Sequence, residues 1–175
     1  MASKPQHFYV ECFIRWFVIP FHVLKKMDGG DAAFVAFSIG FSLCERFHRV
    51  EAKTQDKFDD YTFRDYAAKH LNVSKDLFSG FWDVFRNGIQ HQASPKWKAG
   101  DNKRRKAYKW AISAEFPPVP VIGVNEKKEE VICIDPWGFT EHYIYLFIAN
   151  PELLKDAVQH SFGHIFEESK VTIPG

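Results

Sequence analysis

The longest helical pattern in the chain is DAAFVAFSIGFSLCERFHRVEA, residues 31–52. Its apolar stripe has spacings of three and four and consists of Phe34, Phe37, Phe41, Cys44 and Phe47. Such spacing places the side chains on one face of a helix, so the segment predicts a long helix that buries aromatic rings. Asp31 is a residue type that caps helices well, and we expect it to begin this one.

Helical patterns also occur before and after this segment. Residues 8–27 are apolar around most of the helix circumference, with a kink or break expected at Pro20. Two further helices are predicted over 62–71 and from Ser74, which caps the second, to about Ala93. The chain therefore begins as a helical bundle.

The pattern changes in the second half of the chain. Residues 107–116 alternate apolar and polar side chains, and residues 119–124 and 130–135 flank a polar turn, which predicts a small antiparallel sheet or hairpin insertion at about 107–134. Pro118 and Pro120 confine their strand to an edge. Helices resume over 139–149 and again from Asn150 and Pro151. The predicted fold class is mainly α.

Length and composition limit the alternatives. The 175 residues are 46% hydrophobic, with 18 phenylalanines, which suits one domain spanning 1–175 with a core or partner surface made of aromatic rings. The net charge of +1 excludes a global basic field for nucleic acid, so any such binding needs a local patch. The three cysteines are far apart, which favours free thiols in a reducing compartment. No signal peptide or membrane span is evident, and we expect a soluble, cytoplasmic protein without a membrane partner.

One short stretch, RNGIQH at residues 86–91, carries side chains suited to chemistry at the end of an apolar helix. His91 titrates near neutral pH and can accept or donate a proton, whereas Arg86 stays charged and can bind phosphate with two parallel hydrogen bonds. Asn87 can hydrogen-bond phosphate or orient the imidazole. The predicted catalytic residues are therefore Arg86, Asn87 and His91.

This stretch resembles the R-x4-6-H motif of HEPN-domain proteins, which are small helical bundles in which a polar residue often follows the arginine. The longer phrase FWDVFRNGIQHQ, residues 81–92, matches the aromatic residues that many members carry before the motif. The resemblance implies a HEPN-like bundle that acts as a metal-independent endoribonuclease through attack of the RNA 2′-hydroxyl, with no cofactor. It also implies a homodimer, a role as a toxin or phage-defence effector, and a cognate antitoxin or regulatory partner.

Arg86 and His91 do not meet on a regular helix, where five residues separate them by about 140° and about 7.5 Å. Gly88 weakens the helix between them, so one expectation is that the last turn unwinds and brings the two side chains together. The other is that two copies of the chain place their motifs in one cleft.

Charged residues near the motif extend the candidate site. Asp83 lies three residues before Arg86 and can pair with it on the helix surface, and Glu45 resembles an acidic residue that some HEPN members place against the arginine. A basic stretch follows the motif, with aromatic residues between the cations. Its predicted RNA-binding residues are Lys96, Lys98, Lys103, Arg104, Arg105 and Lys106.

Alternative functions remain for each of these residues. Cations at a helix C-terminus also complement the helix dipole, and the basic stretch also suits a solvated loop that leads into a strand. His160 and His164 have the spacing of a metal-binding pair but no evident third ligand, so no metal site is predicted. The two alternative functions are a non-catalytic HEPN-like module that binds RNA or protein, and a structural helical interaction protein.

Overall fold

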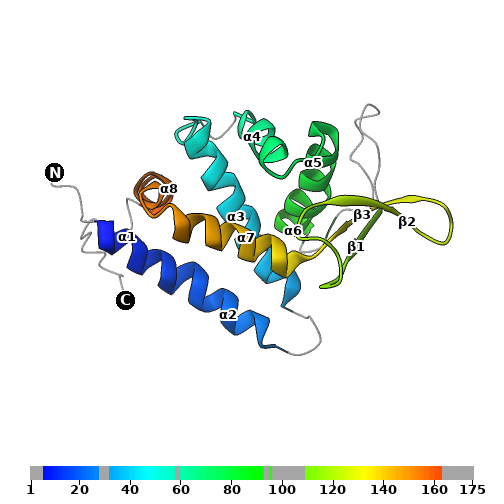
Figure 1. The fold of residues 1–175 in the computed structure, drawn as a ribbon, viewed down its shortest axis with the longest axis horizontal. Coiled ribbons are helices and arrows are strands. Elements are labelled where there is room, and N and C mark those ends of the chain that lie inside the picture. The colour runs from blue at the N-terminus through cyan, green and yellow to red at the C-terminus, as the bar shows by residue number, and fades with distance from the viewer. Residues whose placement is uncertain (1–5, 28–31, 58–59, 93–94, 96–108, 163–175) are drawn as a thin grey trace, which may run out of the picture.

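The computed structural model describes residues 6–27, 32–57, 60–92, 95 and 109–162. The fold is mainly α, with a small three-stranded sheet at one end (Figure 1). The sequence prediction of a mainly helical chain is confirmed. None of the helices formed by the described residues is long and apolar enough to cross a membrane.

Two helices, α3 (Ala33–Glu51) and α7 (Pro136–Ala149), form the centre of the fold. The predicted stripe of α3 is buried at Phe37, Phe41, Cys44 and Phe47. The helices approach so closely that a Cβ at Gly40 would lie 2.5 Å from Thr140 Oγ1. The Thr140 hydroxyl donates to the Ala36 carbonyl across this contact, at 2.9 Å.

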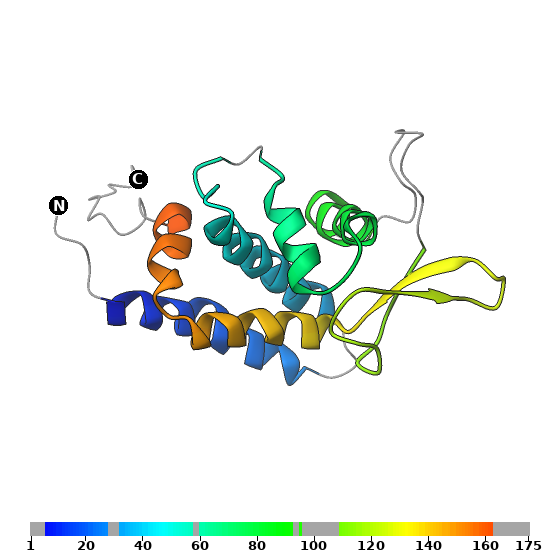
Figure 2. The ribbon, with the colours of Figure 1, turned by 45° about the horizontal axis from the view of Figure 1, so that its top comes forward.

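The N-terminal helices run beside α7 as one continuous rod (Figure 2). This rod consists of α1 (Gln6–Phe13), the π-helical turn η1 (Ile14–Val18) and α2 (Ile19–Lys25). Ring contacts at Phe13–Phe147 (5.5 Å) and Phe21–Trp137 (6.0 Å) hold the rod against α7. The break expected at Pro20 is a π-helical turn just before the proline, which lacks the N–H of a regular helix.

On the other side of α3 lie α4 (Phe63–His70) and one unbroken helical run of α5 (Lys75–Phe81), η3 (Trp82–Arg86) and α6 (Asn87–Gln92). The last helix, α8 (Leu153–Phe162), packs against α1 and α3 at the end of the molecule away from the sheet (Figure 1). Ser74 caps α5 as predicted, since its hydroxyl accepts from the Leu77 N–H at 3.1 Å. Phe81 and Phe85 pack on Phe37, so this run belongs to the same core as α3.

The sheet is mixed, which corrects the prediction of an antiparallel sheet at about 107–134. Its strands are β1 (Lys109–Ile112), β2 (Val121–Val124) and β3 (Glu130–Ile134), in the order β1-β3-β2. The hairpin of β2 and β3 is antiparallel as predicted, but β1 pairs parallel to β3. The eight residues between β1 and β2 include Pro117, Pro118 and Pro120, so the chain turns away from β1 and β3 takes the central place. The proline-bordered β2 is an edge strand, as expected.

Two predicted helix starts differ from the structure. The N-cap of α3 is Ala32, which makes no side-chain capping bond, and Asp31 lies outside the described residues. Asn150 ends α7, because its side-chain amide donates to the Leu146 carbonyl at 2.8 Å, and α8 begins only at Leu153. Asp135 is the capping residue that leads from β3 into α7, where it accepts from the N–H groups of Trp137 and Gly138 at 2.9 Å each.

Candidate functional site

Arg86, the first residue of the RNGIQH motif, lies at the end of the π-helical turn η3 and points toward α3. Its Nη2 lies 3.3 Å from Glu45 Oε2, and both side chains are about three-quarters buried or more. The neighbouring Nη1 donates to Asn87 Oδ1 at 3.2 Å, and the guanidinium lies 5.7 Å from the Trp82 ring centre. Two residues that are 41 positions apart in the chain are thus joined; the resemblance implied such a contact for Glu45 and Arg86.

Glu45 also binds a second arginine, from its own helix. Arg49 lies one turn further along α3, and its Nε and Nη2 are each 2.9 Å from Glu45 Oε1. Arg49 is buried, and its Nη1 donates to the backbone carbonyls of Lys57 (2.6 Å) and Asp60 (3.0 Å). Because one carboxylate orients two guanidinium groups, Glu45 fixes the position of Arg86 relative to α3.

Asp83 and Asn87 continue the network on the helical run that carries Arg86. The Asn87 side-chain amide donates to Asp83 Oδ1 at 2.9 Å, and Arg64 Nη1 from α4 lies 3.8 Å from the same oxygen. The contacts of Asp83 therefore reach α4 as well as its own helix. Asn87 accepts from Arg86 and donates to Asp83, so it connects the two halves of the network.

Sequence reasoning missed two members of this group, Arg49 and Arg64. We define the arginine cluster as Arg49, Arg64 and Arg86 with the carboxylates Glu45 and Asp83. Within this set of residues, the two carboxylates hold three guanidinium groups close together. The signal that could have revealed Arg49 is its i,i+4 spacing from Glu45.

The backbone around His91 corrects one expectation about the motif. Residues 75–92 are helical throughout, so the last turn does not unwind at Gly88. The irregularity lies just before Gly88, in the π-helical turn that ends at Arg86, and Gly88 itself is buried within the helix. The structure places His91 on α6 but does not describe its side chain.

The basic stretch that follows the motif falls outside the described residues. Lys96, Lys98, Lys103, Arg104, Arg105 and Lys106 are all in this segment, as are the aromatic residues Trp97 and Tyr108. Of the residues that follow, Lys109 forms an ion pair with Glu129 on the sheet. Trp110 is partly buried and packs against Phe34 and Phe85, with ring centres 6.0 Å apart in each case, so its ring lies against the core.

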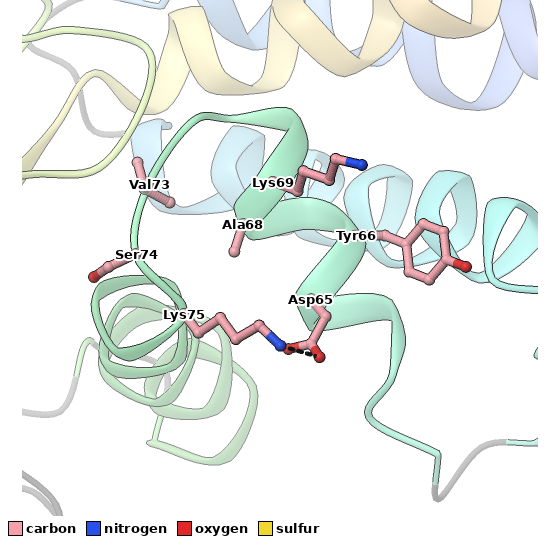
Figure 3. A pocket seen from close by; sticks show the side chains of 7 residues that line it. All are labelled: Asp65, Tyr66, Ala68, Lys69, Val73, Ser74 and Lys75. Atoms are coloured by element: carbon pink, nitrogen blue, oxygen red, sulfur yellow. Dashed lines mark hydrogen bonds and ion pairs between the residues drawn. The ribbon is translucent and has the colours of Figure 1, made fainter.

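A shallow hollow lies between α4 and α5, away from the predicted site residues (Figure 3). Its lining includes Asp65, Tyr66, Lys69 and Lys75, and the Lys75 Nζ lies 2.5 Å from Asp65 Oδ2 across the hollow. Both partners of this ion pair are more than half exposed, so it contributes little to stability. None of the predicted catalytic, RNA-binding or supporting acidic residues that the structure describes lines the hollow.

A second polar group, which sequence reasoning also missed, surrounds His48 on α3. His48 is fully buried, with Nδ1 2.5 Å from Glu51 Oε2 and Nε2 3.1 Å from the Tyr143 hydroxyl. Burial, together with the nearby His70 and His142, lowers the pKa of His48 to about 3. The imidazole is therefore neutral at physiological pH and acts as a structural hydrogen-bonding group between α3 and α7.

A metal centre of three or more protein ligands would need several ligating side chains close together. Within the described part of the chain, no group of three or more His, Cys, Asp or Glu side chains could hold a metal ion. His160 lies on α8 without a described side chain, and His164 lies outside the described residues. Comparison with protein-family models, with curated proteins and with solved structures gave no match.

Proposed function

We propose that this protein is a metal-independent endoribonuclease of the HEPN type, with Arg86, Asn87 and His91 as its catalytic residues. The observation that carries the proposal is the contact between Arg86 and Glu45, which holds the motif arginine against an acidic residue of α3. The resemblance of the motif implies this pairing, and the two residues are too far apart in sequence for helix geometry alone to produce it. A guanidinium group can bind phosphate through two parallel hydrogen bonds, so Arg86 is a suitable residue type for a phosphate ligand.

The chemistry requires a base, an acid and a cation. His91 takes the proton from a ribose 2′-hydroxyl, or returns a proton to the 5′-oxygen that leaves. The 2′-oxygen attacks phosphorus and the bond to the 5′-oxygen breaks, which leaves a 2′,3′-cyclic phosphate. Arg86 stabilises the charge that develops on the phosphate oxygens, and Asn87 orients the phosphate or the imidazole.

The helical backbone of the motif supports a site shared between two copies of the chain. Because residues 75–92 remain helical, positions 86 and 91 lie well apart around the helix axis. A second copy supplies the missing partner if two motifs face one cleft. The proposed partners are accordingly RNA and a second copy of this chain, with an antitoxin as the regulator that a toxin or phage-defence role requires.

The test is cleavage of a 5′-labelled single-stranded RNA by the purified protein in the presence of EDTA. We expect products with 2′,3′-cyclic phosphate ends, and we expect His91→Ala and Arg86→Ala to abolish them. The matched controls are His22→Ala and Arg15→Ala, which change an exposed histidine and an exposed arginine on the N-terminal rod and should cleave at the wild-type rate. Circular dichroism of each variant establishes that the fold is kept. Cleavage that persists in both motif variants would remove the proposal.

A second candidate is a non-catalytic module that binds RNA. It is favoured by the hydrogen bonds of Arg86, whose Nη1 and Nη2 both already have protein acceptors. In that case the arginine cluster stabilises the fold, and RNA binding depends on phosphate contacts. Salt-sensitive binding of RNA without new product ends would support this candidate over the nuclease.

A further inference from the structure

Two histidines from different helices face each other at the surface, away from the arginine cluster. His70 is the last residue of α4, and His142 lies in the middle of α7. Their Nε2 atoms are 3.2 Å apart and their ring centres 5.4 Å apart. His70 follows Arg64 by six residues, about 9 Å along the helix axis, so the pair is separate from the proposed catalytic site.

The separation of the two nitrogens is the one that a shared metal ion requires. Zinc–nitrogen bonds of about 2.0–2.1 Å at a tetrahedral angle place two ligands about 3.3–3.4 Å apart, and a right angle places them about 2.9 Å apart. The observed 3.2 Å lies between these values. Both rings present the same nitrogen, Nε2, which is one of the two imidazole atoms that bind metals in proteins.

The surroundings favour two protein ligands and no more. The third histidine nearby, His48, has a ring centre 5.2 Å from that of His70, but its two nitrogens are occupied by Glu51 and Tyr143. The carboxylate of Glu51 is also engaged, because its Oε2 lies 2.5 Å from His48 Nδ1.

We infer that His70 and His142 form a two-histidine site for a first-row transition metal ion such as Zn²⁺, Ni²⁺ or Cu²⁺, with water in the remaining coordination positions. Imidazole nitrogen suits these ions, whereas Mg²⁺ and Ca²⁺ prefer oxygen ligands. The ion joins the C-terminal end of α4 to α7, so it stabilises the packing of these two helices. It takes no part in the proposed RNA cleavage, which proceeds in EDTA.

The test is titration of the tag-free chain with Zn²⁺ and with Ni²⁺ by isothermal calorimetry, together with the shift of the melting temperature on metal addition. His70→Gln and His142→Gln each keep a polar side chain but remove one ligand. Each is expected to weaken binding by at least about tenfold and to abolish the metal-dependent rise in melting temperature. His22→Ala, at an exposed histidine of α2, serves as the control and should bind as the wild type does.

Several outcomes separate this site from other effects. Binding and a melting-temperature rise that are equal in wild type, His70→Gln and His142→Gln would overturn the inference, since the metal would then be held by other histidines. The inference also fails if neither ion raises the melting temperature of the wild type, because the facing nitrogens would then form only a hydrogen bond. The site is supported if both variants lose the metal-dependent rise in melting temperature while their circular dichroism is unchanged. RNA cleavage is assayed separately in EDTA, so this conclusion does not depend on the result for the nuclease.

Discussion

Glu45→Gln tests the central contact of the arginine cluster with a minimal change of shape. The substitution keeps the size of the side chain and one oxygen, but it removes the negative charge that two arginines share. Glu45 is 19% exposed, and its oxygens lie 2.9 Å from Arg49 and 3.3 Å from Arg86. An amide group in this position would also point N–H donors at guanidinium donors.

The expected loss of folding stability in Glu45→Gln depends on the hydrogen-bond partners that each arginine keeps. Hydrogen bonds to charged groups contribute about 1.5–3 kcal/mol each, and breaking a fully buried ion pair costs about 3–5 kcal/mol. Arg49 retains two backbone carbonyls and Arg86 retains the Asn87 oxygen, so part of the interaction remains. We therefore expect Glu45→Gln to lower the free energy of unfolding by roughly 2–4 kcal/mol.

The assay is urea denaturation followed by circular dichroism, with Glu141→Gln as the matched control. Glu141 pairs with Lys25 at 3.1 Å, but that pair is more exposed, so its loss should cost less than about 1 kcal/mol. Combining Glu45→Gln with Arg86→Met in a double-mutant cycle should give a coupling energy of about 1–3 kcal/mol. A cost below about 1 kcal/mol, or a coupling near zero, would refute the view that Glu45 holds Arg86 in place.

Three further perturbations test other parts of the structure. Gly40→Ala should lower the free energy of unfolding by about 1–3 kcal/mol in urea denaturation, because its methyl group would lie 2.5 Å from Thr140 Oγ1. The control is Ser42→Ala, on the exposed face of the same helix, which should leave the free energy of unfolding nearly unchanged. Burial lowers the pKa of His48 to about 3, so below about pH 6.5 the unfolded chain binds a proton that the folded chain does not. The free energy of unfolding should therefore fall toward acid pH by up to about 1.4 kcal/mol per pH unit. His48→Gln should remove this part of the slope between pH 4 and 6, and an unchanged slope would contradict the assignment. Asp135→Ala should lower the free energy of unfolding by about 1–2 kcal/mol, because two N–H groups of the first turn of α7 lose their acceptor. The control is Asp135→Asn, whose side chain can still cap the helix, and its melting temperature should stay close to that of the wild type.

The local elements were predictable from the sequence because their signals are local. The spacing of Phe37, Phe41 and Phe47 correctly identified the buried face of α3, and Ser74 was correctly identified as a cap. The direction of β1 was not predictable in this way. Parallel or antiparallel pairing depends on how the chain returns to the sheet, and the alternation of side chains along a strand is the same in both cases.

The candidate site was predictable only in part, for a related reason. Glu45 and Arg86 were identified through the motif and its resemblance, and the structure joins them at 3.3 Å. Arg64 carried no such signal, because a charged residue at the start of a polar helix has the pattern of a solvated surface. It joins the cluster only because α4 packs beside the helical run that carries Asp83.

The aromatic composition and the arginine cluster are physically connected. Each arginine of the cluster lies near an aromatic ring: Arg49 is 4.7 Å from the ring centre of Phe63, Arg64 is 4.6 Å from that of Tyr61, and Arg86 is 5.7 Å from that of Trp82. A guanidinium is weakly hydrated and stacks on ring faces, so these contacts reduce the cost of removing it from water. Lysine would lose this advantage, since its ammonium is strongly hydrated and cannot form the same planar contact. Two of these rings, Phe63 and Trp82, belong to the buried core, whereas Tyr61 is exposed. Together the three rings allow three guanidinium groups to converge beside the core.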